Sequence, residues 1–134
     1  MHADENGNIV VPSKLVLEKE THAVIGCAMD ILNEIGHGFF EKVYENALIV
    51  GFKKKDIPYK QQSRYSIRYQ GETVGEYIPD IIAYDQIVVE IKTIDRITPH
   101  EEGQVLNYLK VCNLRLGLIL NFKNARLEWK RIIL

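Results

Sequence analysis

The spacing of apolar residues changes along this 134-residue chain, and that change constrains the fold more than any other feature. Apolar residues recur at helical spacing over 18–35 and again over 40–54, which predicts two helices. Beyond residue 58 they alternate with polar residues, as half-buried strands do, and helical spacing returns over 97–112. The chain then ends in two short apolar segments. This order predicts a mixed α/β domain: two helices, three strands, a helix and two strands.

Several local signals set the expected boundaries of these elements. Gly36 and Gly38 end the first helix, because glycine adopts the left-handed conformation of a helix end at little cost. In the second helix the apolar stripe is expected to comprise Phe40, Val43, Ala47 and Val50. Pro99 suits the first turn of the third helix. The strands are predicted over 65–69, 73–84, 87–92, 115–122 and 126–134.

Composition is that of an ordinary soluble globular protein, with 46% hydrophobic and 26% charged residues. No apolar stretch approaches the roughly 18 residues that cross a bilayer, so no membrane partner is expected. Cys27 and Cys112 lie in apolar segments and are predicted to be reduced thiols of a cytoplasmic protein. Residues 1–14 are expected to form a flexible N-terminal tail, and residues 15–134 a single domain.

The segment YIPDIIAYDQIVVEIKT, residues 77–93, combines two strand-like apolar runs with three charges: Asp80, Glu90 and Lys92. An unpaired buried charge costs several kcal/mol, so these groups require compensation. Two carboxylates are hard oxygen ligands suited to Mg²⁺ or Mn²⁺, and the backbone carbonyl of Ile91 could add another. Lys92 shares a sheet face with Glu90 and could assist a water or stabilise charge on a phosphoryl oxygen. A plain ion-pair cluster is the alternative interpretation.

A shared site requires a particular strand register. If Asp85 and Gln86 formed a two-residue hairpin, Asp80 would face Ile91 and point away from Glu90. A three-residue turn or a bulge shifts the register by one residue and brings the two carboxylates to one face. We therefore predict such an irregularity between residues 81 and 89.

Motifs outside this segment extend the pattern. PDIIAYDQIVVEIK resembles the motif of the PD-(D/E)xK nuclease superfamily, and GFFEKVY, with Gly38, Glu41 and Tyr44, resembles the signature of the GxxExxY protein family within that superfamily. PHEEGQVLNYLK and GLILNF also resemble closing segments of that family. The resemblance covers nearly the whole chain from about residue 18. It implies a restriction-endonuclease-like core, a central mixed sheet flanked by helices.

The resemblance also implies roles for single residues. Asp80, Glu90 and Lys92 take the core catalytic positions, and Glu41 supplements the metal site from a helix. Gln104 and Tyr108 match a QxxxY motif whose spacing places both on one helical face, where they could order the lysine, a water or a phosphate. The residues themselves leave simpler roles open: Glu41 could serve the helix dipole, and the other two could be packing residues.

A basic strip of six residues is the candidate contact for nucleic-acid phosphates, although a solvated surface would carry the same charges. Its members are Lys53, Lys54, Lys55, Lys60, Arg64 and Arg68. The expected function is metal-dependent hydrolysis of phosphodiester bonds in DNA. The alternatives are a module that binds nucleic acid or a protein partner without turnover, and a small subunit of a DNA repair or defence assembly. A protein partner or a homo-oligomer would fit each alternative.

Overall fold

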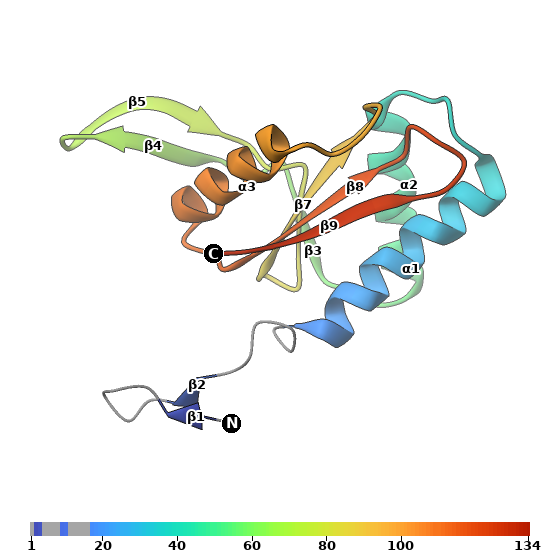
Figure 1. Ribbon diagram of the computed structural model, residues 1–134, viewed down its shortest axis with the longest axis horizontal. Helices are drawn as coiled ribbons and strands as arrows, with labels where there is room; N and C mark the ends of the chain where they lie inside the picture. The colour runs from blue at the N-terminus through green and yellow to red at the C-terminus, as the bar shows by residue number, and fades with distance from the viewer. Residues whose placement is uncertain (1, 4–8, 11–16) are drawn as a thin grey trace.

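A computed structural model describes residues 2–3, 9–10 and 17–134 of the chain (Figure 1). Two short strands, β1 (His2–Ala3) and β2 (Ile9–Val10), pair antiparallel near the N-terminus. The rest of the tail expected over 1–14 lies outside the described residues. No helix in the described ranges has the length and apolar character of a membrane span.

The two N-terminal helices are where the apolar spacing predicts them. Helix α1 spans Glu18–Ile35, and α2 spans Glu41–Lys54. Gly36 follows α1 with φ of 79°, in the left-handed region that favours glycine. The Tyr44 hydroxyl donates a hydrogen bond to the Gly36 carbonyl at 2.8 Å and accepts one from the Phe39 amide at 3.2 Å. The side chain of Tyr44 therefore sets the connection between the two helices.

A five-stranded sheet with the order β3-β6-β7-β8-β9 lies between the helices (Figure 1). Only β7 and β8 are parallel among neighbours in this sheet, so it is mixed, as predicted. Helices α1 and α2 cover one face, and α3 covers the other. The strands are β3 (Tyr59–Gln61), β6 (Ile81–Ala83), β7 (Ile87–Lys92), β8 (Leu116–Asn121) and β9 (Glu128–Ile133).

The single strand predicted over 73–84 is wrong, because the chain divides it between two sheets. Its first part is β5 (Glu72–Tyr77), which pairs with β4 (Tyr65–Tyr69) in a separate ribbon that projects from the body in Figure 1. Its last part is β6 of the central sheet. Pro79 lies at the break, and proline has no N–H to continue a strand ladder. Strand β3 was not predicted, since three residues are too few to show alternation.

The third helix, α3 (Pro99–Cys112), begins with a full capping box. The Thr98 side chain accepts a hydrogen bond from the His100 amide at 3.3 Å, and Glu101 accepts one from the Thr98 amide at 2.8 Å. Pro99 occupies the first turn as predicted, where its missing N–H has no partner to lose. Leu109 and Val105 then pack on the buried strand β8.

The apolar stripe predicted for α2 is wrong. Phe40, Val43 and Val50 are exposed, with Phe40 at 87%. The buried face consists of Tyr44, Glu45, Leu48, Ile49 and Phe52. This helix carries apolar residues on both sides, so spacing alone does not identify the face that meets the sheet.

Candidate active site

The turn between β6 and β7 has the three-residue form that the shared carboxylate site requires. Ala83 pairs with Ile87, which leaves residues 84–86 in the turn. Tyr84 and Asp85 both have left-handed backbone, with φ of 56° and 57°. Ile81 pairs with Val89, so the same register continued by one residue brings the segment at Asp80 beside Glu90. The predicted irregularity is confirmed.

Asp80 lies between the ribbon and the central sheet, immediately before β6. Its Oδ2 accepts a hydrogen bond from the backbone amide of Ile91 at 2.9 Å. Burial raises the pKa of Asp80, the Ile91 amide opposes that rise, and the charges of Glu45 and Glu41 add to it. Asp80 is therefore fixed to β7 through one oxygen and has acidic neighbours from α2.

Glu90 is one of the few buried charged residues, with 7% of its surface exposed. Its Oε1 accepts a hydrogen bond from the Tyr77 hydroxyl. Burial and then the charge of Asp80 raise the pKa of Glu90 to about 7, against the opposing effects of Tyr77 and Lys92. Because a like charge nearby disfavours ionisation, the effect of Asp80 on Glu90 places the two carboxyl groups in one electrostatic environment.

Lys92 and Glu41 belong to the same electrostatic environment. Lys92 ends β7 and is half-buried, and its charge lowers the pKa of both Asp80 and Glu90. Glu41 is the exposed first residue of α2, and its charge raises both pKa values. Three separate segments thus contribute charged groups to one site, namely the approach to β6, the end of β7 and the start of α2.

Glu45 is an acidic residue that sequence reasoning missed. It is 5% exposed, and its Oε2 accepts hydrogen bonds from Gln61 at 2.8 Å, Gln62 at 3.2 Å and Lys42 at 3.0 Å. It lies one helical turn beyond Glu41 and therefore on the same face of α2. Its position four residues after Glu41 was a signal available in the sequence. Glu45 joins α2 to the end of β3 beside Asp80.

The donor atoms are of the type that hard divalent cations prefer, although they are not gathered into a complete ligand cage. Within the described part of the chain, no group of three or more acidic, histidine or cysteine side chains stands ready to hold a metal ion. The recorded hydrogen bonds engage Asp80 Oδ2 and Glu90 Oε1. No donor from residues 17–134 takes the other oxygen of either carboxylate, and carboxylate oxygen suits Mg²⁺ or Mn²⁺. The chemistry of the donor set therefore fits a cation.

Comparison with known families decides the identity of the domain. A family model described as "PD-(D/E)XK nuclease superfamily" matches residues 18–132. The chain belongs to this superfamily. The matched segment includes Asp80, Glu90 and Lys92.

A solved structure supports the fold. The structure described as "Crystal structure of SSO0001" is similar to this chain with a TM-score of 0.53 and 18% sequence identity. The similarity covers 90% of this chain and 60% of that one, so this domain spans less than two thirds of its structural neighbour. At this identity the likeness concerns the fold alone. A search of curated proteins finds no match.

The two residues predicted on α3 are placed differently with respect to the carboxylates. The Tyr108 ring stacks on the Tyr77 ring, with centroids 3.9 Å apart and an interplanar angle of 11°. Tyr108 thus reaches Glu90 through Tyr77. Gln104 is half-buried one turn earlier, and within the described ranges no hydrogen bond joins it to the carboxylates.

The six residues of the basic strip do not lie on one element. Lys53, Lys54 and Lys55 are at the end of α2, about 18 Å along the helix from Glu41 at 1.5 Å per residue. Several members already have polar partners on the surface. Lys55 pairs with Asp30, Lys60 with Asp85 and Arg64 with Glu76, and Arg68 donates to the Gly71 carbonyl. The strip is therefore a distributed set of cations rather than a compact patch.

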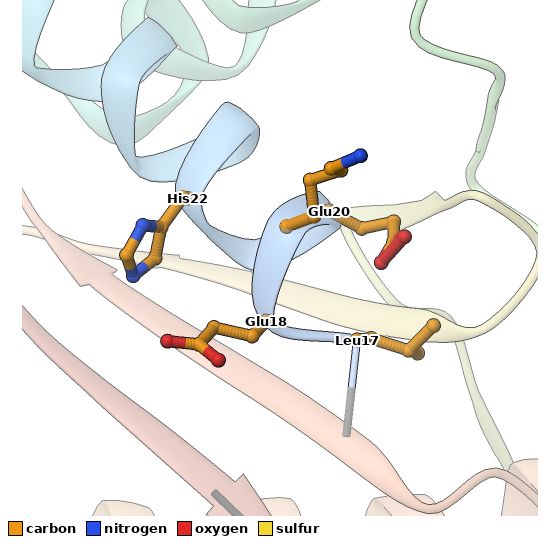
Figure 2. A pocket seen from close by; sticks show the side chains of 5 residues that line it. Leu17, Glu18, Glu20 and His22 are labelled. Atoms are coloured by element: carbon orange, nitrogen blue, oxygen red, sulfur yellow. The ribbon is translucent and has the colours of Figure 1, made fainter. Parts of the chain in front are cut away.

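A surface hollow of about 510 Å³ lies at the start of α1 and shares no lining residue with this site. Figure 2 shows its lining, in which Glu18 and His22 lie on one side of the helix start and Glu20 on the other. Leu17 and Lys19 complete it. None of the predicted site residues lines it, so it has no part in the carboxylate site.

Proposed function

We propose that this superfamily domain is a cytoplasmic metal-dependent nuclease that hydrolyses phosphodiester bonds in DNA. The observation that supports the proposal is the position of half-buried Asp80 beside buried Glu90, in the register fixed by β6 and β7, with the charge of Lys92 acting on both. A protein retains such an arrangement at a cost in stability, and a divalent cation would relieve it. The superfamily membership gives this arrangement its chemical interpretation.

The proposed cofactor is Mg²⁺ or Mn²⁺, held by Asp80, Glu90, the Ile91 carbonyl and Glu41. When bound, the cation would supply Lewis-acid activation of water and neutralise charge on the phosphoryl group. Each of the protein's own residues has a separate proposed role. Asp80 and Glu90 would hold the cation with the oxygens left free by their hydrogen bonds, and Lys92 would stabilise negative charge on the phosphoryl oxygens. Gln104 and Tyr108 are proposed to support this geometry from α3.

We also propose that the chain belongs to the GxxExxY family. Each position of that signature has a physical role compatible with the site. Gly38 has φ of 103°, which a residue with a side chain rarely adopts, and Glu41 is the first residue of α2. Tyr44 ties the connection before α2 to its own helix through the hydrogen bond to Gly36. The signature would thus place the Glu41 carboxylate at the edge of the site.

The basic strip is proposed to contact the phosphate backbone outside the reaction centre. Lys53 and Lys54 are exposed at the end of α2 and would contribute long-range attraction, as phosphate contacts do in non-specific binding. A strip distributed over several elements suits a partner that extends across the surface. A protein partner or a second copy of the chain could complete that surface.

A non-catalytic binding module is the second candidate function. It is favoured by the lack, among the described residues, of three acidic side chains ready to hold a metal. A domain that uses this fold only to hold nucleic acid would need the positive groups but no metal. The two candidates differ in whether a divalent cation binds and whether the phosphodiester bond breaks.

Titration calorimetry with Mn²⁺, followed by a cleavage assay on plasmid and single-stranded DNA, tests the proposal. Wild-type protein is expected to bind Mn²⁺ and to cleave, and Asp80→Ala to do neither. Lys92→Ala is expected to bind Mn²⁺ but to lose cleavage, whereas Lys110→Ala, an exposed lysine on α3, retains both. Wild-type protein that binds DNA without nicking it in Mg²⁺ or Mn²⁺ would establish the binding module instead.

A further inference from the structure

Tyr77 occupies a position that the superfamily motif does not include but the geometry singles out. It is the last residue of β5, three residues before Asp80, and only 7% of its surface is exposed. Its hydroxyl donates a hydrogen bond to Glu90 Oε1. Tyr77 therefore contacts one predicted metal ligand from the strand that leads to the other.

The Tyr77 ring stacks on one ring and lies across the ribbon from another tyrosine. Tyr108 of α3 stacks on it at a centroid distance of 3.9 Å. Tyr65 of β4 is its cross-strand partner in the ribbon and belongs to the same apolar cluster. A ring fixed in this way leaves its hydroxyl little freedom, so the hydrogen bond to Glu90 has a defined direction.

A carboxylate on a flexible side chain binds a cation well only when its rotation is restricted. Residues that hydrogen-bond a metal ligand commonly provide that restriction. Tyr77 occupies Glu90 Oε1, which leaves Glu90 Oε2 as the oxygen directed to other ligands. The Ile91 amide likewise donates a hydrogen bond to Asp80 Oδ2, which leaves Asp80 Oδ1 for other ligands. The two carboxylates are thus each anchored by one oxygen.

We propose that Tyr77, clamped by the ring of Tyr108, is a positioning residue that orients the Glu90 carboxylate for binding of a divalent cation. This inference rests on the proposed function. It also assigns Tyr108 a specific part, namely to support Tyr77 through its ring rather than to contact substrate through its hydroxyl. Tyr77 of β5 contacts Glu90 directly, and Tyr108 of α3 contacts it through the Tyr77 ring, so the ribbon and α3 both reach the site.

The test compares Mn²⁺ affinity among tyrosine variants by titration calorimetry. Tyr77→Phe keeps the stacked ring and removes the hydroxyl, and Tyr65→Phe removes a hydroxyl from the opposite residue of the same ribbon. Tyr108→Ala removes the stacked ring. Because the Tyr77 hydroxyl lowers the Glu90 pKa, affinities are measured over a series of pH values above the wild-type pKa of about 7. The affinity that no longer changes with pH, where Glu90 is ionised in every variant, reports orientation.

Tyr77→Phe is expected to weaken Mn²⁺ binding by roughly 10- to 100-fold. Its thermal midpoint is expected to fall below that of Tyr65→Phe, because buried Glu90 loses a hydrogen-bond donor, and a single cooperative transition shows that the variant is folded. Tyr65→Phe is expected to bind as wild type does, and Tyr108→Ala to bind as weakly as Tyr77→Phe. Unchanged affinity in Tyr77→Phe, with binding still abolished by Asp80→Ala, would overturn this inference alone. Wild-type protein that binds no Mn²⁺ would overturn it together with the proposed function.

Discussion

The buried carboxyl group of Glu90 makes the stability of this domain depend on pH, and the substitution Glu90→Gln isolates that dependence. Glutamine has nearly the same shape and does not titrate. Burial and the charge of Asp80 raise the Glu90 pKa from its usual 4.5 to about 7 in the folded protein. Between these two values the folded protein keeps a proton that the unfolded chain has lost.

The sign and size of the effect follow from this difference. The unfolded state binds fewer protons between pH 4.5 and about 7, so the free energy of unfolding falls as pH rises through this window. Below the lower pKa, Glu90 is protonated in both states and does not reduce the free energy of unfolding. Above the upper pKa it is ionised in both states, and the full reduction is present. At roughly 1.4 kcal/mol per pH unit, the loss amounts to about 3.5 kcal/mol. Compared with its difference from wild type at acidic pH, Glu90→Gln should therefore gain about 3.5 kcal/mol above neutral pH.

Urea unfolding at a series of pH values, without divalent cations, measures this difference. The free energy of unfolding of wild type is expected to fall relative to that of Glu90→Gln across the window and then to run parallel to it. Leu106→Met, a substitution of similar volume on α3, serves as a control whose difference from wild type should not vary with pH. A constant difference between wild type and Glu90→Gln over the whole range would refute the desolvated, crowded environment of this carboxyl.

Three further predictions concern the cation, the packing and the basic strip. Mn²⁺ at 100 times its dissociation constant should raise the free energy of unfolding by about 2.7 kcal/mol above neutral pH, as measured by urea unfolding, with no rise in Asp80→Ala. Gly117→Ala should cost about 1–3 kcal/mol in the same assay, because the added Cβ would lie 2.5 Å from Val105 Cγ1. Gly26→Ala, with open space around its Cβ, should be neutral or stabilising. Lys53→Glu should weaken DNA binding and lower its salt dependence by about one phosphate contact, and unchanged binding would leave this residue outside the interface.

Local sequence patterns predicted much of the fold because they report local backbone preferences. The bounds of α1 followed from helical spacing and the glycines after it, and α3 followed from spacing with Pro99 at its start. The three-residue turn after β6 was predicted by a different argument. Asp80 and Glu90 could share a face only in one register, so the need to compensate their charges selected the turn.

Properties that depend on distant parts of the chain were not predictable in this way. Pro79 interrupts the strand character of the sequence over 73–84, but only the tertiary structure shows that the two parts belong to different sheets. The buried face of α2 could not be read from spacing, since apolar residues such as Val50 and Leu48 occur on both sides of the helix. Packing against the sheet determines which of the two sides is buried.

The sequence by itself determined the class of the domain, the main elements and the charged residues of its candidate site. Tertiary structure decided which of these residues meet and what holds them. Tyr77 touches Glu90, and Glu45 joins α2 to β3, because strands and helices far apart in the chain pack together. Spacing along a chain encodes a preference for local conformation, whereas hydrogen bonds between distant side chains exist only after the core has brought their backbones into place.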